Sequence, residues 1–406
     1  MDIRATARAW SLKAFFFLLG MTVPCSARIS VDDSLAVRAI FNKNNLSDTA
    51  ISGFADTSRG RVTALFLQSR KLTVLPPEIG KLTGLRILLL DNNALTSLPP
   101  EIGTLTALNN LSLANNKLAA LPMEVAGLGQ LTALNLDGNR FSAFPEQIAV
   151  LDALYKLSFK GNGCAALPTA LGRMRSVHYL YLDSNKIRSL PAETASLSQL
   201  EVLSLACNSL AAFPMPIVKL QNLRILDVSQ NRISVLPDSV ASLVALTDLY
   251  LSNNRLSGIS PAVKALKNLR LFYVDRNALT ALPAELTGLT SLMWFSAAGN
   301  KLSTVPDSIG NLRQLKVLDL SFNTLQALPQ SITALTGLTI LRINHNRIAA
   351  LPDSIFKLNG LIVVQGKKTY PSLELGENEL CALSLKVTEW ATEFNPTWRE
   401  TQKCKK

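Results

Sequence analysis

The residues best suited to covalent or metal chemistry are five cysteines and two histidines, scattered along a chain of 406 residues. His178 and His345 lie in distant parts of the sequence, so we expect neither a shared metal site nor a catalytic triad. The cysteines include no CxxC pair with zinc-ligand spacing. Glycine-rich phosphate loops and nucleophile motifs are also missing from the sequence. We therefore predict no catalytic residue, no metal site and no cofactor.

A second group of residues has the chemistry for binding rather than for catalysis. Its aromatic members are Tyr179, Tyr181, Tyr250, Tyr273 and Trp294, and its acidic members are Asp227, Asp248, Asp275 and Asp319. Rigid aromatic rings with polar tips dominate protein-binding surfaces, and rings beside carboxylates also suit sugars. Strands favour tyrosine and tryptophan for packing reasons alone, which is the alternative interpretation. The structural element that carries these residues bears on the choice between the ligand-binding and the strand-packing interpretation.

That element is a repeat of 23 residues, marked by asparagine. The marker occurs at Asn93, Asn116, Asn139, Asn162, Asn185, Asn208, Asn231, Asn254, Asn277, Asn300, Asn323 and Asn346. Around each one runs the frame LxxLxLxxNxLxxLPxxIxxLxxL. The LxL part has the period of a strand, and the part after the proline has the spacing of a helical turn. Each unit is therefore predicted to be one short strand and a return segment, stacked on its neighbours to bury the leucines.

This frame resembles the typical 23-residue class of the leucine-rich-repeat family, with its LPxxI motif, across residues 62–360. The resemblance implies an α/β solenoid, shaped as a horseshoe or arc, with a curved parallel sheet on its concave face and capping elements at both ends. We expect each asparagine amide to satisfy backbone groups that the bend after the strand leaves unpaired. The proline suits the start of the return segment because it needs no donor there.

Departures from the frame define the remaining segments. We predict a signal peptide at 1–27, an N-terminal cap at 28–61, thirteen repeats at 62–360, an irregular final repeat at 361–383 and a C-terminal helical cap and tail at 384–406. In the first cap, residues 32–34 have helix-start chemistry. About nine extra residues near 367–371 interrupt the period, after which Asn378 takes the marker role. The last helix is expected from Ser384, and it resembles the C-terminal ends of some secreted bacterial repeat proteins.

The N-terminal segment predicts export. A basic stretch precedes the apolar run from Ala14 to Val23, and small residues follow at Ser26 and Ala27. A lipid anchor at Cys25 is the alternative, although Thr22–Pro24 make a poor lipobox. No later apolar stretch is long enough to span a membrane. We therefore expect a secreted or extracytoplasmic protein, in the periplasm or at the cell surface.

Net charge favours anionic partners. The formal charge of +12 becomes +10 once residues 1–27, with three basic and one acidic side chain, are removed. A basic balance attracts acidic proteins, acidic glycans or lipid headgroups over long range. Because an exported chain rarely meets nucleic acid, we predict no nucleic-acid partner.

Cysteine positions suggest one disulfide. Cys381 and Cys404 flank the C-terminal helix in an oxidising compartment, and we predict that they are bonded to each other. Cys164 is expected to point inward and Cys207 to lie at the rim, two repeats away. Two strand spacings are roughly 10 Å, which is beyond the reach of a disulfide.

The frame places the aromatic and acidic residues on the concave face. In LxxLxLxxN the two strand residues between the leucines, and the residue after the last leucine, face the concave solvent side. Tyr181, Tyr250 and Tyr273 therefore fall in one column, with Tyr179, Asp248 and Trp294 in the next. Asp275 lies on the other side of the central column. We predict a ligand-binding surface over the middle and later repeats.

A basic rim forms a second candidate site. Directly after the marker position come Lys71, Lys117, Arg140, Lys186, Arg232, Arg255, Lys301 and Arg347. Such a stripe could dock an anionic polymer or envelope surface, with binding that weakens in salt. The alternative is that the long stems cover the leucines beneath and keep the rim in solution.

Three functions fit these observations. The first is a non-catalytic extracytoplasmic scaffold that binds a protein or peptide on its concave face. The second is a cell-surface adhesin or glycan-binding protein. The third is an intracellular signalling scaffold, because the LPxxI repeats also resemble those of Ras-pathway leucine-rich-repeat proteins. Cleavage of the N-terminal segment on export would exclude the third.

Overall fold

A computed structural model describes residues 29–46, 53–361 and 372–404. The signal peptide predicted at 1–27, the alternative lipid anchor at Cys25 and the insertion near 367–371 lie outside the described residues. Within the described ranges, none of the helices is both long and apolar enough to cross a membrane.

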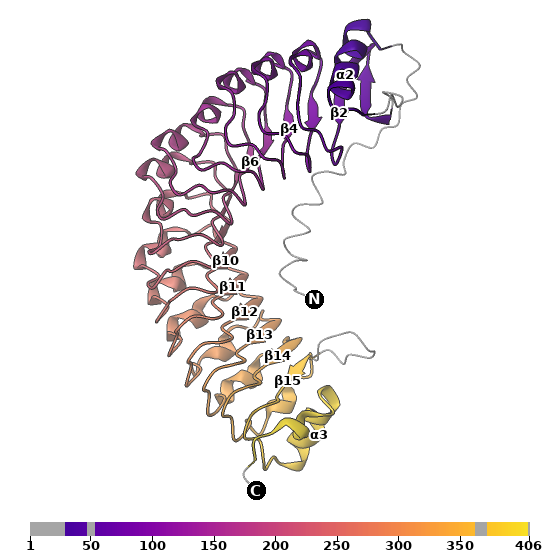
Figure 1. The fold of residues 1–406 in the computed structure, drawn as a ribbon. Coiled ribbons are helices and arrows are strands. Elements are labelled where there is room, and N and C mark those ends of the chain that lie inside the picture. The colour runs from indigo at the N-terminus through magenta and orange to yellow at the C-terminus, as the bar shows by residue number, and fades with distance from the viewer. Residues whose placement is uncertain (1–28, 47–52, 362–371, 405–406) are drawn as a thin grey trace.

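The described chain forms an arc lined on its concave side by one sheet, as the sequence predicts (Figure 1). Its fifteen strands follow one another in chain order, and every neighbouring pair is parallel except the first, β1 and β2. The strands are β1 (Ala55–Ser58), β2 (Arg61–Phe66), β3 (Ile87–Leu89), β4 (Asn110–Ser112), β5 (Ala133–Asn135), β6 (Lys156–Ser158), β7 (Tyr179–Tyr181), β8 (Val202–Ser204), β9 (Ile225–Asp227), β10 (Asp248–Tyr250), β11 (Leu271–Tyr273), β12 (Trp294–Ser296), β13 (Val317–Asp319), β14 (Ile340–Arg342) and β15 (Leu373–Glu374). In-register pairing, such as Tyr250 with Tyr273, aligns equivalent positions of successive units.

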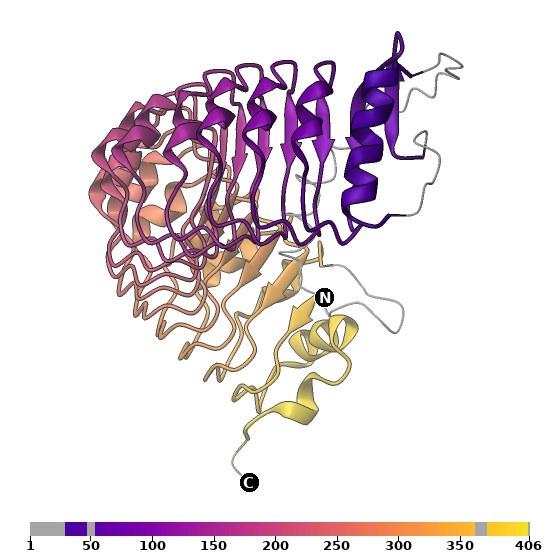
Figure 2. The same cartoon turned by 45° about the horizontal axis from the view of Figure 1, so that its top comes forward.

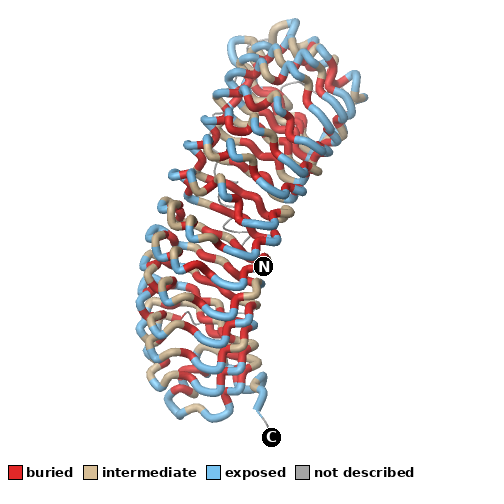
Figure 3. Tube along the Cα trace, turned by 90° about the vertical axis from the view of Figure 1, so that its left-hand side faces the viewer, coloured by how far each residue is buried: buried red, intermediate tan, exposed pale blue. Residues whose placement is uncertain are grey.

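Short 3-10 helices form the convex side. They are η2 (Pro77–Lys81), η3 (Pro100–Thr104), η4 (Met123–Gly127), η5 (Glu146–Val150), η6 (Thr169–Arg173), η7 (Ala192–Ser196), η8 (Met215–Lys219), η9 (Asp238–Ser242), η10 (Pro261–Ala265), η11 (Ala284–Gly288), η12 (Ile309–Asn311), η13 (Gln330–Ala334) and η14 (Ile355–Lys357). In most of them the proline of the LP motif is the N-cap residue in extended conformation, as at Pro99 and Pro191. The leucines between the two layers are buried along the whole arc (Figure 3).

The marker asparagines join each unit to its predecessor. In each of the thirteen, from Asn93 to Asn346 and again at Asn378, the side-chain amide donates to carbonyls of its own bend and of the preceding unit. The side-chain oxygen accepts from a backbone amide of the preceding unit. These contacts confirm the predicted role of asparagine, because each one satisfies backbone groups that the bend would leave unpaired.

The position before each marker has a positive φ in all units from Ser69 to Glu377. This left-handed conformation is inexpensive for glycine and tolerated by asparagine. Several repeats carry such a residue there, namely Asn92, Asn115, Gly138, Gly161, Asn253 and Gly299. The sequence therefore contained a signal for this turn that the leucine frame alone does not express.

The N-terminal cap contains helix α2 (Val31–Lys43). The helix starts slightly earlier than residues 32–34 suggest, because Ser30 is the N-cap residue and its hydroxyl accepts from the Asp33 amide. Asp33 is fully buried, and its carboxylate accepts from the Val62 amide at 2.6 Å and pairs with Arg61 at 3.0 Å. This carboxylate connects the cap helix to the first strands, and β1 and β2 form an antiparallel hairpin that the sequence pattern did not predict.

The C-terminal cap contains helix α3 (Leu385–Phe394) and η15 (Trp398–Thr401). Val387, Trp390 and Ala391 are buried against the last units, and Trp398 is buried with them. Cys381 and Cys404 form the predicted disulfide, whereas Cys164 and Cys207 are not disulfide-bonded, as expected. The disulfide ties the residue after the last unit to the segment that follows the helix.

Candidate functional site

Three aromatic rings form a continuous cluster on the concave face of β10, β11 and β12. The rings of Tyr250 and Tyr273 stack with centroids 5.2 Å apart and an interplanar angle of 12°. Trp294 follows at 5.9 Å from the Tyr273 ring. The parallel register places these residues on adjacent strands, so the sequence prediction that they gather is confirmed. We call Tyr250, Tyr273 and Trp294 the aromatic cluster.

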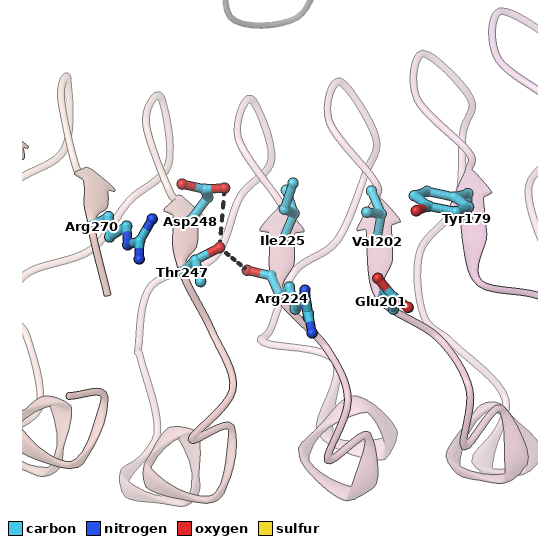
Figure 4. A pocket seen from close by; sticks show the side chains of 8 residues that line it. All are labelled: Tyr179, Glu201, Val202, Arg224, Ile225, Thr247, Asp248 and Arg270. Carbon is cyan, nitrogen blue, oxygen red and sulfur yellow. Dashed lines mark hydrogen bonds between the residues drawn. The ribbon is translucent and has the colours of Figure 1, made fainter. Parts of the chain in front are cut away.

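A hollow of about 410 Å³ lies beside this cluster, over β7 to β10 (Figure 4). Its lining comes from the first residue of each strand and from the residue just before the strand. The lining residues are Tyr179, Glu201, Val202, Arg224, Ile225, Thr247, Asp248 and Arg270. In Figure 4 Tyr179 lies at one end and Arg270 at the other, with Asp248, on the same strand as Tyr250, next to Arg270.

Charged side chains of both signs surround the hollow. Arg224, Arg270, Glu201 and Asp248 make no ion pair with one another or with any other described residue. Partial burial raises the pKa of Asp248, while the Thr247 hydroxyl at 3.2 Å and the charge of Arg270 act in the opposite direction. Val202 and Ile225 supply apolar surface between the charges. The hollow can therefore accept an apolar group flanked by charges or hydrogen-bonding groups.

Tyr179 belongs to a second aromatic contact that the strand columns did not predict. Its ring lies 5.2 Å from Tyr155, and the Tyr155 ring lies 4.3 Å from His178. A hydrogen bond with Tyr155, followed by partial burial, raises the pKa of Tyr179 to about 12. Tyr179 is therefore a neutral hydrogen-bonding group at physiological pH.

Tyr181 lies apart from the aromatic cluster, because β8 and β9 separate β7 from β10. The Lys160 ammonium is 4.4 Å from the centre of the Tyr181 ring and forms an ion pair with Asp183 at 2.9 Å. Burial, followed by the charge of Asp183, raises the pKa of Tyr181. This ring is thus partly engaged by its own neighbours.

Three of the predicted acidic binding residues already serve the sheet itself. Asp227 and Asp275 are each only 4% exposed. Asp227 accepts from the amide and hydroxyl of Ser229, and Asp275 accepts from the Ser252 and Ser296 hydroxyls and the Ala298 amide.

Asp319 accepts from the backbone amide and the hydroxyl of Ser321 and forms an ion pair with Arg342 at 3.6 Å. The structure thus gives Asp227, Asp275 and Asp319 a structural role. Among the predicted acidic residues, Asp248 is the one that lines the hollow.

Sequence reasoning missed Glu201, Arg224, Thr247 and Arg270, because it considered the outward residues of each strand and the residue after its last leucine, but not the residue before the strand. These four residues occupy the second position of LxxLxL, directly before their strands, and this column was left out of the sequence analysis. A further exposed aromatic contact, Phe322 stacked on His345 at 4.1 Å, lies at the positive-φ position of two successive units. Among the described residues, no group of three or more His, Cys, Asp or Glu side chains could hold a metal ion.

All eight residues of the basic rim are exposed, and they follow the bend at the end of each strand. In the seven from Lys117 to Arg347 the backbone amide donates to the preceding unit, as Lys117 does to Leu95 and Arg140 to Leu118. None of the eight forms an ion pair with another described residue. The rim and the hollow are separate surfaces, since the rim lies beyond the ends of the strands whose beginnings line the hollow.

Comparison with known families gives two matches along the repeats. The family described as "Leucine-rich repeat region" matches residues 69–160 and 192–298, and the family described as "Leucine rich repeat" matches residues 298–348. None of the curated proteins compared with the chain matches it.

Solved structures resemble the chain over most of its length. A leucine-rich-repeat protein of Leptospira interrogans is 31% identical, with 92% of this chain and 97% of that chain covered and a TM-score of 0.76. The plant peptide hormone receptor RGFR1, solved in complex with RGF2, is 29% identical, with 74% of this chain and 58% of that chain covered and a TM-score of 0.52. An internalin of Listeria monocytogenes, 22% identical over 86% of this chain and 100% of that chain with a TM-score of 0.67, shares the fold.

Proposed function

Because the chain belongs to the leucine-rich-repeat family, we propose that it is a non-catalytic recognition scaffold that binds a protein or peptide across β7 to β12 of its concave face. Proteins of this family and fold are typically binding scaffolds. The proposal also places the protein outside the cytoplasm, on the basis of its signal-peptide pattern and its disulfide.

One observation supports this function best, namely the aromatic cluster beside the hollow. Stacked rings offer a large rigid apolar area, which is the feature that dominates binding energy at protein interfaces. The hollow adds apolar floor and unpaired charges of both signs. Polypeptides carry apolar groups next to charges and backbone amides, whereas neutral sugars carry no charged group. This combination therefore favours a polypeptide ligand.

The similar structures are consistent with such a ligand. RGFR1 was solved with RGF2, and the Arabidopsis receptor kinase HAESA, 26% identical with a TM-score of 0.56, was solved with the peptide hormone IDA and a co-receptor. This chain spans only 58% and 56% of those two chains. These structures support a peptide as the class of ligand.

The test is selection of binders from a random peptide display library on the immobilised mature protein, beside a glycan array. The decisive variant replaces Tyr250, Tyr273 and Trp294 together by alanine. We expect selected peptides to bind the parent protein and to lose at least tenfold in affinity for the variant, because hot-spot aromatics each contribute about 2 kcal/mol or more. Circular dichroism and thermal unfolding check that the variant is folded.

A matched control removes three exposed apolar side chains elsewhere, by Met123→Ala, Met215→Ala and Phe322→Ala. Peptide affinity for this control is expected to equal that of the parent. An equal loss of peptide affinity in both variants would contradict a site at the aromatic cluster. Unchanged peptide affinity of the aromatic triple variant would contradict it as well. Glycan binding with no peptide enrichment would favour the glycan-binding alternative.

A further inference from the structure

The bends that contain the marker asparagines carry charge of one sign. In each of the thirteen repeats of residues 62–360, from the one with Arg70 at the marker position to the one with Asn346, we consider the six positions from the residue before the marker to the fourth residue after it. We call this surface the asparagine edge. Across all units it contains no Asp or Glu. It contains eleven Lys or Arg residues, namely the eight of the basic rim with Arg70, Arg188 and Arg276.

These eleven cations are free to meet a ligand. Each of them is exposed, and none forms an ion pair with another described residue. Arg70 lies over the Phe54 ring at 4.4 Å, which leaves its charge unneutralised. The final unit ends the pattern, because Glu377 and Glu379 flank Asn378 and Glu377 pairs with Lys403 at 3.2 Å.

Acidic residues occur on both sides of the asparagine edge in the sequence but not within it. Directly before it stand Asp91, Asp137, Asp183 and Asp275, whose carboxylates accept from a serine hydroxyl and a backbone amide of the next unit. After it, acids occupy the first turn of many 3-10 helices, as Glu78, Glu101, Glu124, Glu146, Glu193, Asp238 and Glu285. If the rim cations served only to cover leucines and keep the surface in solution, an interspersed acid would do no harm. The restriction of acids to positions outside the edge instead leaves a row of cations of one sign along it, which gives this edge a positive field.

We propose that the asparagine edge binds a linear acidic polysaccharide. Successive strands lie about 4.8 Å apart, so cations in adjacent or alternate units are spaced by roughly 5 to 10 Å along the edge. Regularly spaced carboxylates or sulfates on a chain polymer complement such a row. Binding would combine many weak ion pairs over the arc, without a pocket for any single sugar.

The shape of the arc favours a flexible polymer over a membrane surface. In Figure 2 the strands of the N-terminal repeats run at an angle to those of the C-terminal repeats, so the edge twists along its length. A flat bilayer would touch only part of a twisted edge. A flexible chain follows both the curvature and the twist, and it can therefore reach cations from Lys71 to Arg347 in one complex.

The experiment measures affinity of the mature protein for alginate, for heparin and for phosphatidylglycerol vesicles, at low and at physiological salt. The test variant carries Arg232→Gln, Arg255→Gln and Lys301→Gln. We expect both polymers to bind the parent, with affinity that falls steeply as salt rises. The variant is expected to bind roughly tenfold or more weakly at low salt, because cations close to an anionic surface contribute additively.

The matched control carries Lys219→Gln, Lys264→Gln and Arg313→Gln, which remove the same charge from exposed positions outside the edge. It is expected to bind the polymers like the parent. Equal weakening of both variants would overturn the proposal in favour of net charge alone. Vesicle binding stronger than polymer binding would overturn it in favour of a membrane surface. The concave aromatic triple variant is expected to retain polymer binding, so failure of the peptide proposal is distinguishable from failure of this one.

Discussion

The side-chain oxygen of Asn139 accepts a hydrogen bond from the backbone amide of Leu118, which lies 21 residues earlier in the preceding unit, at 3.0 Å. The amide nitrogen of the same side chain donates to Leu113 in the preceding unit at 2.9 Å and to Leu136 in its own bend at 3.1 Å. One buried side chain thus closes its own turn and links it to its neighbour. Repetition of this contact makes the stack of units cooperative.

Replacement of Asn139 by alanine should destabilise the fold by about 2 kcal/mol, because it leaves the buried Leu118 amide without its acceptor. The Leu113 and Leu136 carbonyls lose one donor each and keep the amides of Asn116 and Asn162. Urea unfolding followed by circular dichroism measures the change. Asn268→Ala is the control, since its exposed side chain makes a single bond to Val244, and we expect a loss below about 1 kcal/mol. Similar losses for the two variants would contradict the proposed role of the marker.

Alanine at Gly138 should cost more stability than alanine at Gly161. Both glycines have a positive φ, +61° and +63°, so alanine is strained by about 1 kcal/mol at either position. At Gly138 an added Cβ would also lie 2.3 Å from Oδ1 of Asn115, so the exposed Asn115 side chain must move and give up its hydrogen bond to Asn92. At Gly161 the nearest atom is 3.6 Å away. Thermal unfolding of the two variants checks the order, and Gly161→Asn should lose less than Gly161→Ala because asparagine tolerates this conformation.

Removal of the disulfide by Cys381→Ser and Cys404→Ser should loosen the C-terminal cap. The bond spans a sequence separation of 23 residues, and closing such a loop contributes on the order of 3 kcal/mol. Amide hydrogen exchange should increase in α3 and stay unchanged in the central repeats. The intact mass of the parent should rise by two hydrogens on reduction and denaturation. An unchanged mass would show that these cysteines are not bonded.

Asp248→Asn should stabilise the protein at neutral pH. Burial raises the pKa of Asp248, so this group adds stability below its unfolded pKa of about 3.9 and loses that contribution as pH rises through the folded value. Asparagine does not titrate and therefore avoids the cost of burying a charge. The advantage of the variant should shrink as pH falls below 4, as urea unfolding at the two pH values can show.

Asp152→Asn, at an exposed position, is the control for this pH dependence. We expect its unfolding midpoint to differ little from that of the parent at either pH. A neutral-pH loss of stability in Asp248→Asn would mean that the attraction between Asp248 and Arg270 outweighs desolvation.

The sequence by itself determined the period, the inward leucines, the marker contacts and the outward columns of the strands. These follow from local rules, because strand alternation and bend chemistry repeat every 23 residues whatever lies beside them. Tyr250, Tyr273 and Trp294 could be brought together in this way, since in-register parallel strands place equivalent positions side by side.

Only the tertiary structure decided which polar side chains remain available to a ligand. Asp227 and Asp275 belong to outward columns, yet their carboxylates are taken up by serine hydroxyls and backbone amides of the sheet. Arg224 and Arg270 lie outside those columns, yet they line the hollow with Asp248. The reason is physical: hydrogen bonding and burial between neighbouring units depend on side-chain conformations across the stack, which a one-dimensional period does not contain.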